Sequence, residues 1–133
     1  MPTLKLAEAA KGTLPLVLTG EGGDELFGGY GRYRRALRPA WLGGREAAPQ
    51  VDATFLRAGW SSAVEDWKQA VAYSEPPEGL SRLQRAQWAD IVTWLPNDLL
   101  LKLDRCLMAH GLEGRTPFLD KAVADFAFNL PDS

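Results

Sequence analysis

Apolar residues recur every three or four positions along much of this chain, and this spacing predicts a mostly helical structure. The pattern is clearest in the second half, over residues 80–95 and again over residues 99–107. A shorter helix is expected over residues 4–10, because Gly12 follows its last turn and glycine commonly ends helices. The capping box Ser62–Glu65 predicts one more helix in the middle of the chain.

Prolines and polar caps set the expected ends of these helices. The helix over residues 80–95 is expected to stop before Pro96, because proline lacks an N–H and its ring clashes with the preceding turn. Asn97 is then well placed to cap a new helix over residues 98–109. We expect residues 24–37 to form one continuous helix, although each of its three glycines weakens a helix by about 1 kcal/mol.

Only one stretch has the character of a β-strand, the apolar run over residues 14–18. No later segment is typical of a second strand. A single strand would leave half of its backbone groups without hydrogen bonds, so we expect its partner strands to lie outside this chain.

The strand is followed by an acidic, glycine-rich loop over residues 20–30, which carries five glycines in its first ten residues. Glycines let the backbone come close to a ligand, and open α/β sheets bind ligands at the carboxyl ends of their strands. The carboxylates of Glu21, Asp24 and Glu25 would repel a bare phosphate, so a phosphate ligand here implies Mg²⁺, for which Asp24 is a suitable ligand. The same pattern is also typical of an ordinary helix start, where carboxylates complement the helix dipole.

A second polar turn, over residues 112–120, follows the last leucine-rich helix. Glu113 and Arg115 are placed either to form a structural ion pair or to line a substrate pocket, and the residues alone leave both interpretations open. Asp120 is expected to cap a final helix.

Composition narrows the class of protein. With 133 residues and 46% hydrophobic content the chain can form one folded domain. A net charge of −2 and a pI near 5.4 argue against a nucleic-acid-binding surface. The single cysteine, Cys106, excludes an internal disulfide, and no apolar run approaches the 18 residues of a membrane span, so we expect a cytoplasmic protein without a membrane partner.

Several isolated residues have both a chemical and a structural interpretation. His110, the only histidine, is expected to complement a helix C-terminus rather than act as a base. Cys106 is expected to be buried and inert. A group of arginines that could contact an anion or an acidic partner, or simply form a solvated or docking face, comprises Arg32, Arg34, Arg35 and Arg38.

The two polar turns and their flanking residues, 18–30 and 95–120, resemble the synthetase domain of glutamine-dependent asparagine synthetases. The motifs are Leu-Thr-Gly-Glu-Gly-Gly-Asp-Glu-Leu-Phe-Gly-Gly-Tyr and, about 65 residues on, Leu-Pro-Asn-Asp-Leu-Leu-Leu-Lys-Leu-Asp-Arg with Met-Ala-His-Gly-Leu-Glu-Gly-Arg-Thr-Pro-Phe-Leu-Asp. The resemblance implies an α/β parent fold of the adenine nucleotide alpha hydrolase type, with a doubly wound parallel sheet. Residues 1–133 would then be a mostly helical part of that domain, with one short strand.

The resemblance also implies an activity, that of an ATP-dependent amide ligase. Members of the family convert aspartate to asparagine through β-aspartyl-AMP, which reacts with ammonia derived from glutamine, and they require Mg²⁺. By position, Thr19 and Gly20 are similar to the residues that contact ATP, and Glu21 to the carboxylate that handles protons at the ammonia step. Asp24 is similar to the ligand of Mg²⁺ and pyrophosphate, and Glu113 with Arg115 would lie on the substrate side.

The chain also departs from the family pattern. The pyrophosphate loop Ser-Gly-Gly-x-Asp-Ser is absent, no cysteine follows Met1, and Lys121 lies too close to the second motif to be the family's catalytic lysine. We therefore expect a middle piece of a synthetase that is inactive in isolation.

Two alternatives remain open at this point. One is an adenylating enzyme similar to β-lactam synthetases, although those carry tyrosine where this chain has Glu21. The other is a non-catalytic helical interaction module from a truncated synthetase, which binds a partner through an exposed apolar edge. We also expect the isolated chain to self-associate through that edge or to be marginally stable.

Overall fold

The computed structural model describes residues 2–44, 66 and 76–132, and in these residues the chain is mostly helical, as its periodicity predicts. The helix expected at Ser62–Glu65 lies outside the described residues. The described elements are α1 (Pro2–Ala10), β1 (Leu16–Leu18), α2 (Gly23–Phe27), α3 (Gly31–Leu37), the 3₁₀ turn η1 (Ala40–Leu42), α5 (Arg82–Val92), the π-helical segment η3 (Leu95–Leu100), α6 (Leu101–Met108), β2 (Glu113–Arg115), the 3₁₀ turn η4 (Pro117–Leu119) and α7 (Lys121–Phe128).

The strand β1 has a partner within the chain, so the expectation of a single unpaired strand is wrong. β1 and β2 pair in parallel, with Val17 opposite Gly114 at the centre of the register. The Glu113 N–H donates to the Pro15 carbonyl at 3.2 Å, and the Thr19 N–H donates to the Arg115 carbonyl at 2.9 Å. The sequence of β2 is polar and has no hydrophobic alternation, and β2 forms because its backbone completes the hydrogen bonds of β1.

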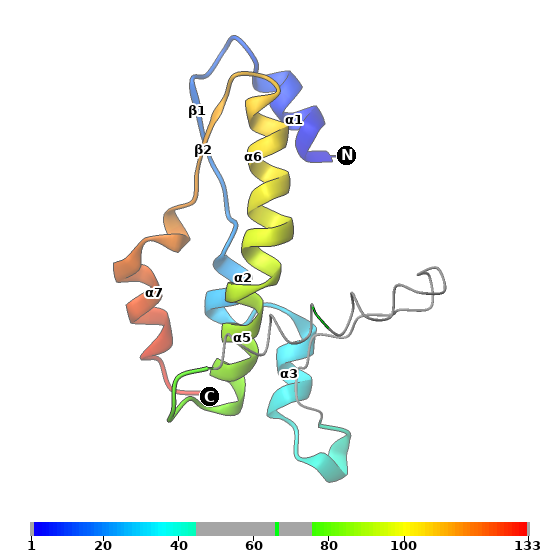
Figure 1. Cartoon of the computed structure of the whole chain (residues 1–133), viewed down its shortest axis with the longest axis vertical. Coiled ribbons are helices and arrows are strands. Elements are labelled where there is room, and N and C mark those ends of the chain that lie inside the picture. The colour runs from blue at the N-terminus through cyan, green and yellow to red at the C-terminus, as the bar shows by residue number, and fades with distance from the viewer. Residues whose placement is uncertain (1, 45–65, 67–75, 133) are drawn as a thin grey trace.

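The main core lies between α1, α6 and the strand pair. Figure 1 shows α6 running beside both strands, with α1 against its upper part. Each leucine side chain buried there contributes about 1.5–3 kcal/mol. The fully buried members of this core are Ala7, Leu103, Leu107 and Leu112, and Ala10 and Val17 pack against them.

The continuous helix expected over residues 24–37 is instead two helices, α2 and α3. Gly28 has φ of 70°, a left-handed conformation that ends α2. The chain then folds back, and a Cβ on Gly29 would lie 1.9 Å from Asp24 Oδ1. The cluster of glycines therefore breaks the helix rather than merely weakening it.

α5 ends at Val92, before Pro96, as expected, but helical turns resume at Leu95 rather than at Asp98. α5, η3 and α6 follow one another as one column of helical turns (Figure 1), and Pro96 lies in the first turn of the π-helical segment. The wider π turn accommodates a residue that has no N–H to donate. Asn97 does not cap α6, because its side-chain amide donates back to the Thr93 carbonyl at 2.8 Å.

A second, smaller core joins α3 to α5. It contains Tyr33, Ala36 and Ala86, all buried, with Tyr30 and Leu83 beside them. The Tyr33 hydroxyl donates to Asp90 Oδ2 at 2.5 Å. Arg32 also pairs with Asp90, so one arginine of the basic group has an acidic partner within the chain, while the other three are exposed.

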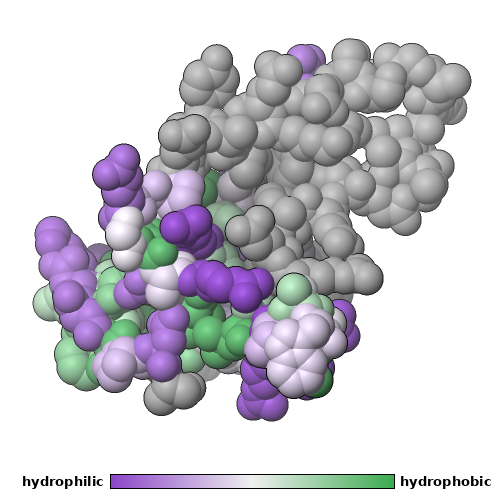
Figure 2. Space-filling view, turned by 90° about the horizontal axis from the view of Figure 1, so that it is seen from below, coloured by the Kyte–Doolittle hydropathy of each residue, from purple (hydrophilic) through white to green (hydrophobic). Residues whose placement is uncertain are grey.

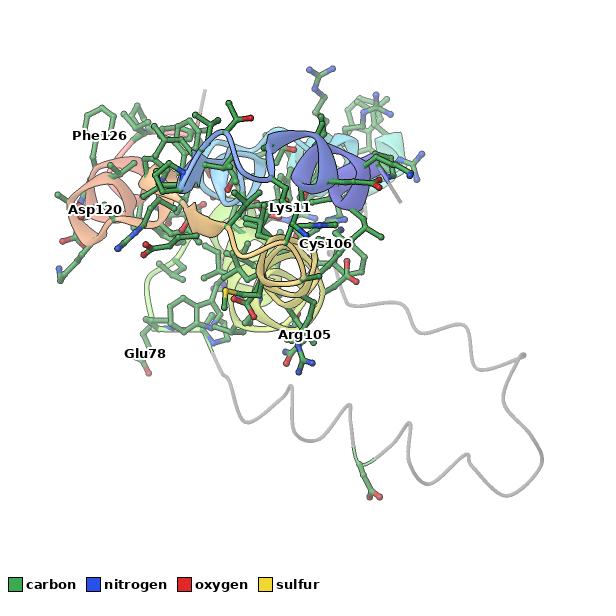
Figure 3. All side chains as sticks on the ribbon, turned by 90° about the horizontal axis from the view of Figure 1, so that it is seen from above. Lys11, Glu78, Arg105, Cys106, Asp120 and Phe126 are labelled. Carbon is green, nitrogen blue, oxygen red and sulfur yellow. The ribbon has the colours of Figure 1, made fainter. Side chains whose placement is uncertain are left out.

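The last helix, α7, begins as predicted: Asp120 Oδ1 accepts a hydrogen bond from the Ala122 N–H at 2.8 Å. Its Phe126 lies on the outer side of the molecule and is 61% exposed (Figure 3). Figure 2 shows further hydrophobic residues that reach the surface between hydrophilic ones. Other exposed large apolar side chains include Leu6, Leu18, Trp41, Leu42 and Met108. Self-association through such a surface stays a prediction.

The approach of β2 to α6 generates a test of the core. A Cβ on Gly114 would lie 2.5 Å from Leu107 Cδ1, inside the main core, so Gly114→Ala should lower the free energy of unfolding by about 1–3 kcal/mol. Gly31→Ala is the control, because no atom lies within 4 Å of the position that its Cβ would take and alanine favours a helix. Urea denaturation followed by circular dichroism measures both, and equal stabilities would contradict the proposed contact.

Candidate active site

The pairing of β1 with β2 brings the two polar turns to the same end of the strand pair. The first turn leaves β1 at Thr19, whose N–H is bonded to Arg115 in β2. The Gly23 N–H then donates to the Gly20 carbonyl at 3.1 Å, and α2 begins at once. The acidic, glycine-rich loop therefore sits at the carboxyl end of a parallel strand, as the sequence predicts.

Packing against the second turn explains part of the glycine content. Gly22 is buried with φ of 90°, and a Cβ there would lie 2.2 Å from Leu119 Cδ2. The rings of Phe27 and Phe118 meet edge to face, with centroids 6.0 Å apart. Gly20 differs, because no atom lies within 4 Å of its Cβ position. The backbone is thus open to a ligand at Gly20 and closed by protein at Gly22.

Glu21 lies partly buried among charged groups, and its pKa is raised above the ordinary value of 4.5. Burial is the main cause, because it disfavours the charged carboxylate. Lys102 opposes this effect and lowers the pKa, while Glu25, Asp98 and Asp24 raise it. A carboxylate with a raised pKa holds a proton more readily than an exposed one, which suits a general base.

Lys102 and Asp98 are the site residues that the sequence reasoning missed. Asp98 lies in η3 and Lys102 in α6, and the Lys102 Nζ is 3.7 Å from Asp98 Oδ2. Asp98 and Lys102 are four residues apart in the second motif, and this spacing in a helix could have predicted their ion pair. Their influence on Glu21 follows only from the way the helical column passes the loop.

Thr19 has a side chain that protein groups leave unsatisfied. Its Oγ1 is buried and has no hydrogen-bond partner among the described residues. A buried hydroxyl without a partner is unfavourable by about 1–3 kcal/mol, so this atom fits a polar group of a ligand. The contact of Thr19 and Gly20 with a nucleotide stays a prediction.

Asp24 is exposed in the first turn of α2, where its carboxylate is free to meet a ligand. The described residues contain no group of three or more His, Cys, Asp or Glu side chains that could hold a metal ion. An Mg²⁺ ion at Asp24 would therefore take its other ligands from phosphate oxygens and water, which is common for this ion.

Glu113 and Arg115 form the ion pair that was one of two interpretations. The Arg115 Nη2 lies 2.5 Å from Glu113 Oε1, and both side chains are more than half exposed. In solvent such a pair contributes only about 0–1 kcal/mol. Arg115 adjoins the loop through its bond to Thr19, whereas Glu113 lies opposite Leu16, farther from the loop.

The remaining candidates lie on or just beyond α6. Cys106 is buried, as predicted. Figure 3 shows Arg105 pointing outward from the same helix. His110 follows the C-terminal end of α6, as predicted, and its N–H donates to the Leu107 carbonyl at 2.9 Å.

Comparisons with known proteins show the family of the chain. The family model for asparagine synthase matches residues 1–133. Asparagine synthetase [glutamine-hydrolyzing] 1 of Bacillus subtilis is 29% identical over 99% of this chain and 27% of its own length. A putative asparagine synthetase of Mycobacterium tuberculosis is 30% identical over 98% of the chain and 26% of its own. Amidase chry2 of Gibberella zeae is 28% identical over the whole chain and 28% of its own.

The chain thus spans about a quarter of the length of the curated relatives it matches. No solved structure matches it. Within the described part of the chain, none of the helices combines the length and the apolar character needed to cross a bilayer.

The raised pKa of Glu21 predicts a dependence of stability on pH. The Glu21 carboxyl binds its proton more tightly in the folded state than in the unfolded state. The stabilisation of the folded state that results is fully present below pH 4.5 and is lost as the pH rises through the folded-state pKa. Wild type should therefore lose stability relative to Glu21→Gln as the pH rises from 4.5 towards 7. Urea titrations across this range measure the difference, with Glu78→Gln on an exposed loop as the control. A constant difference between wild type and Glu21→Gln would contradict the prediction.

Proposed function

Because the chain belongs to the asparagine synthase family, we propose that it forms part of an ATP-dependent amide ligase that converts aspartate to asparagine. The observation that carries the proposal is the meeting of the two polar turns at the end of β1, with Glu21 beside the charges of Asp98 and Lys102. The parallel pairing of β1 and β2 also supports a parent α/β fold with a doubly wound parallel sheet.

In the proposed reaction, Thr19 and Gly20 contact the nucleotide. The unpartnered Thr19 hydroxyl and the open backbone at Gly20 support this role. Bound ATP supplies an activated phosphorus that accepts the aspartate side-chain carboxylate, which gives β-aspartyl-AMP and releases pyrophosphate. Asp24 holds Mg²⁺ on the pyrophosphate side, and its exposed carboxylate at the start of α2 supports that role.

Glu21 acts in the second half of the reaction as the general base. Ammonia derived from glutamine attacks the acyl carbon of β-aspartyl-AMP, a C–N bond forms, and AMP leaves with the electron pair of the broken C–O bond. The proton that the nitrogen must lose passes to the Glu21 carboxylate. Partial burial favours this transfer, because it makes the carboxylate a stronger base than an exposed one.

Two substitutions in a full-length synthetase that contains this segment test the assignment. Glu21→Gln should keep the shape of the loop and spare adenylate formation, while amide formation falls about 100-fold or more through loss of the base. Asp24→Asn should weaken the first half-reaction itself, because it removes a ligand of the cation. Exchange of labelled pyrophosphate into ATP measures the first step, and asparagine production measures the sum of both.

The two variants are controls for each other, since each removes one carboxylate from the same loop. Equal loss of both activities in Glu21→Gln would refute the proton-transfer role. Absence of any ATP-dependent pyrophosphate exchange in the wild-type protein, together with absence of Mg·ATP binding in a calorimetric titration, would refute the ligase itself.

A further inference from the structure

Glu25 is a buried carboxylate for which the proposed reaction provides no task. It follows Asp24 in α2 and is only 1% exposed. Its Oε1 accepts a hydrogen bond from the Tyr30 hydroxyl at 2.7 Å. A carboxylate this deeply buried is unfavourable unless it is hydrogen-bonded, so the bond to Tyr30 is a necessary part of the local structure.

Tyr30 is itself held by the neighbouring helices. The Arg32 guanidinium lies 4.1 Å from the centre of the Tyr30 ring, and the Arg32 Nε donates to Asp90 Oδ2 in α5 at 2.9 Å. The ring of Tyr33 lies against the ring of Tyr30, with centroids 5.6 Å apart. The position of the Tyr30 hydroxyl is therefore set by α3 and α5, which lie outside the loop.

The bond between Tyr30 and Glu25 spans the tight corner that follows Asp24. The Gly29 N–H donates to the Asp24 carbonyl at 3.0 Å, and the Asp24 carboxylate occupies the space that a side chain at position 29 would need. The Gln87 side-chain amide of α5 also donates to the Leu26 carbonyl at 2.8 Å. The helix that carries Asp24 has only five residues, so these few bonds determine where it points.

We propose that Tyr30 and Glu25 are positioning residues, which hold Asp24 and the Glu21 loop in the arrangement that the reaction requires. This inference rests on the function proposed above. The hydroxyl of Tyr30 donates the bond and the buried Glu25 carboxylate accepts it, so the corner is fixed to α3.

The electrostatics of the pair agree with this arrangement. The pKa of Tyr30 is raised well above its usual range, first by burial and then by the hydrogen bond to Glu25, so the hydroxyl keeps the proton that it donates. The negative charge of Glu25 also raises the pKa of Glu21, an effect secondary to that of burial.

Tyr33 provides a matched control, because its hydroxyl also donates to a carboxylate, but to that of Asp90 in α5 rather than to one in the loop. In a full-length synthetase, Tyr30→Phe and Tyr33→Phe each remove one such hydroxyl and keep the ring. We expect both to lower the unfolding temperature by similar amounts. Tyr30→Phe should also lower the kcat of pyrophosphate exchange and of asparagine formation about tenfold, as displaced catalytic groups do, while Tyr33→Phe keeps both within about twofold.

A conservative variant separates positioning from mere stability. Glu25→Gln keeps an oxygen that can accept the Tyr30 hydrogen bond and should retain most of the activity, whereas Glu25→Ala should lose as much as Tyr30→Phe. If Tyr30→Phe and Tyr33→Phe have equal activities while Glu21→Gln still blocks amide formation, the positioning role is overturned and the proposed function is not.

Hydrogen exchange of the ligand-free protein gives a readout that does not depend on turnover. Tyr30→Phe should speed amide exchange at residues 23–29 more than Tyr33→Phe does, because only the first variant frees the corner. Unchanged exchange there would overturn the inference even if the ligase activity itself were absent.

Discussion

Backbone hydrogen bonds between β1 and β2 fix the relative position of the residues in the candidate site. They join the start of the chain to a segment that follows α6, and they do so with three residues on each side. The last bond of the ladder, from the Thr19 N–H to the Arg115 carbonyl, lies where the acidic loop begins. If this pairing were lost, Glu21 and the second polar turn would no longer share one end of the fold.

The helical column of α5, η3 and α6 is the second element on which the site depends. Its π-helical segment includes Pro96 in a helical turn, and the column then packs against both the strands and α1. Asp98 and Lys102 come from this part of the column and act on the charge of Glu21. π-helical segments often occur at functional sites, because the wider turn shifts the side chains that follow it.

Some glycines of the acidic loop are required by packing, and other groups of the loop are available to a ligand. Gly22 and Gly29 are required by protein neighbours, Leu119 in one case and the Asp24 carboxylate in the other. Gly20 and the Thr19 hydroxyl have no such neighbour, and they are the groups left for a ligand. The buried pair of Glu25 and Tyr30 then joins this loop to α3, so that rigid helices support the groups that would perform the chemistry.

Signals that act within a few residues of the chain were enough to predict much of this protein. The helix α1 and its glycine stop, the cap of α7 by Asp120, the burial of Cys106 and a polar loop at the end of β1 all follow from local propensity and periodicity. Tertiary structure alone decided the pairing of a polar β2, the π-helical turn that contains Pro96, and the contacts of Glu21 and Glu25. These features depend on hydrogen bonds and charge interactions between residues that are distant in sequence. The energies of these interactions exceed the local conformational preferences of proline and of a polar segment.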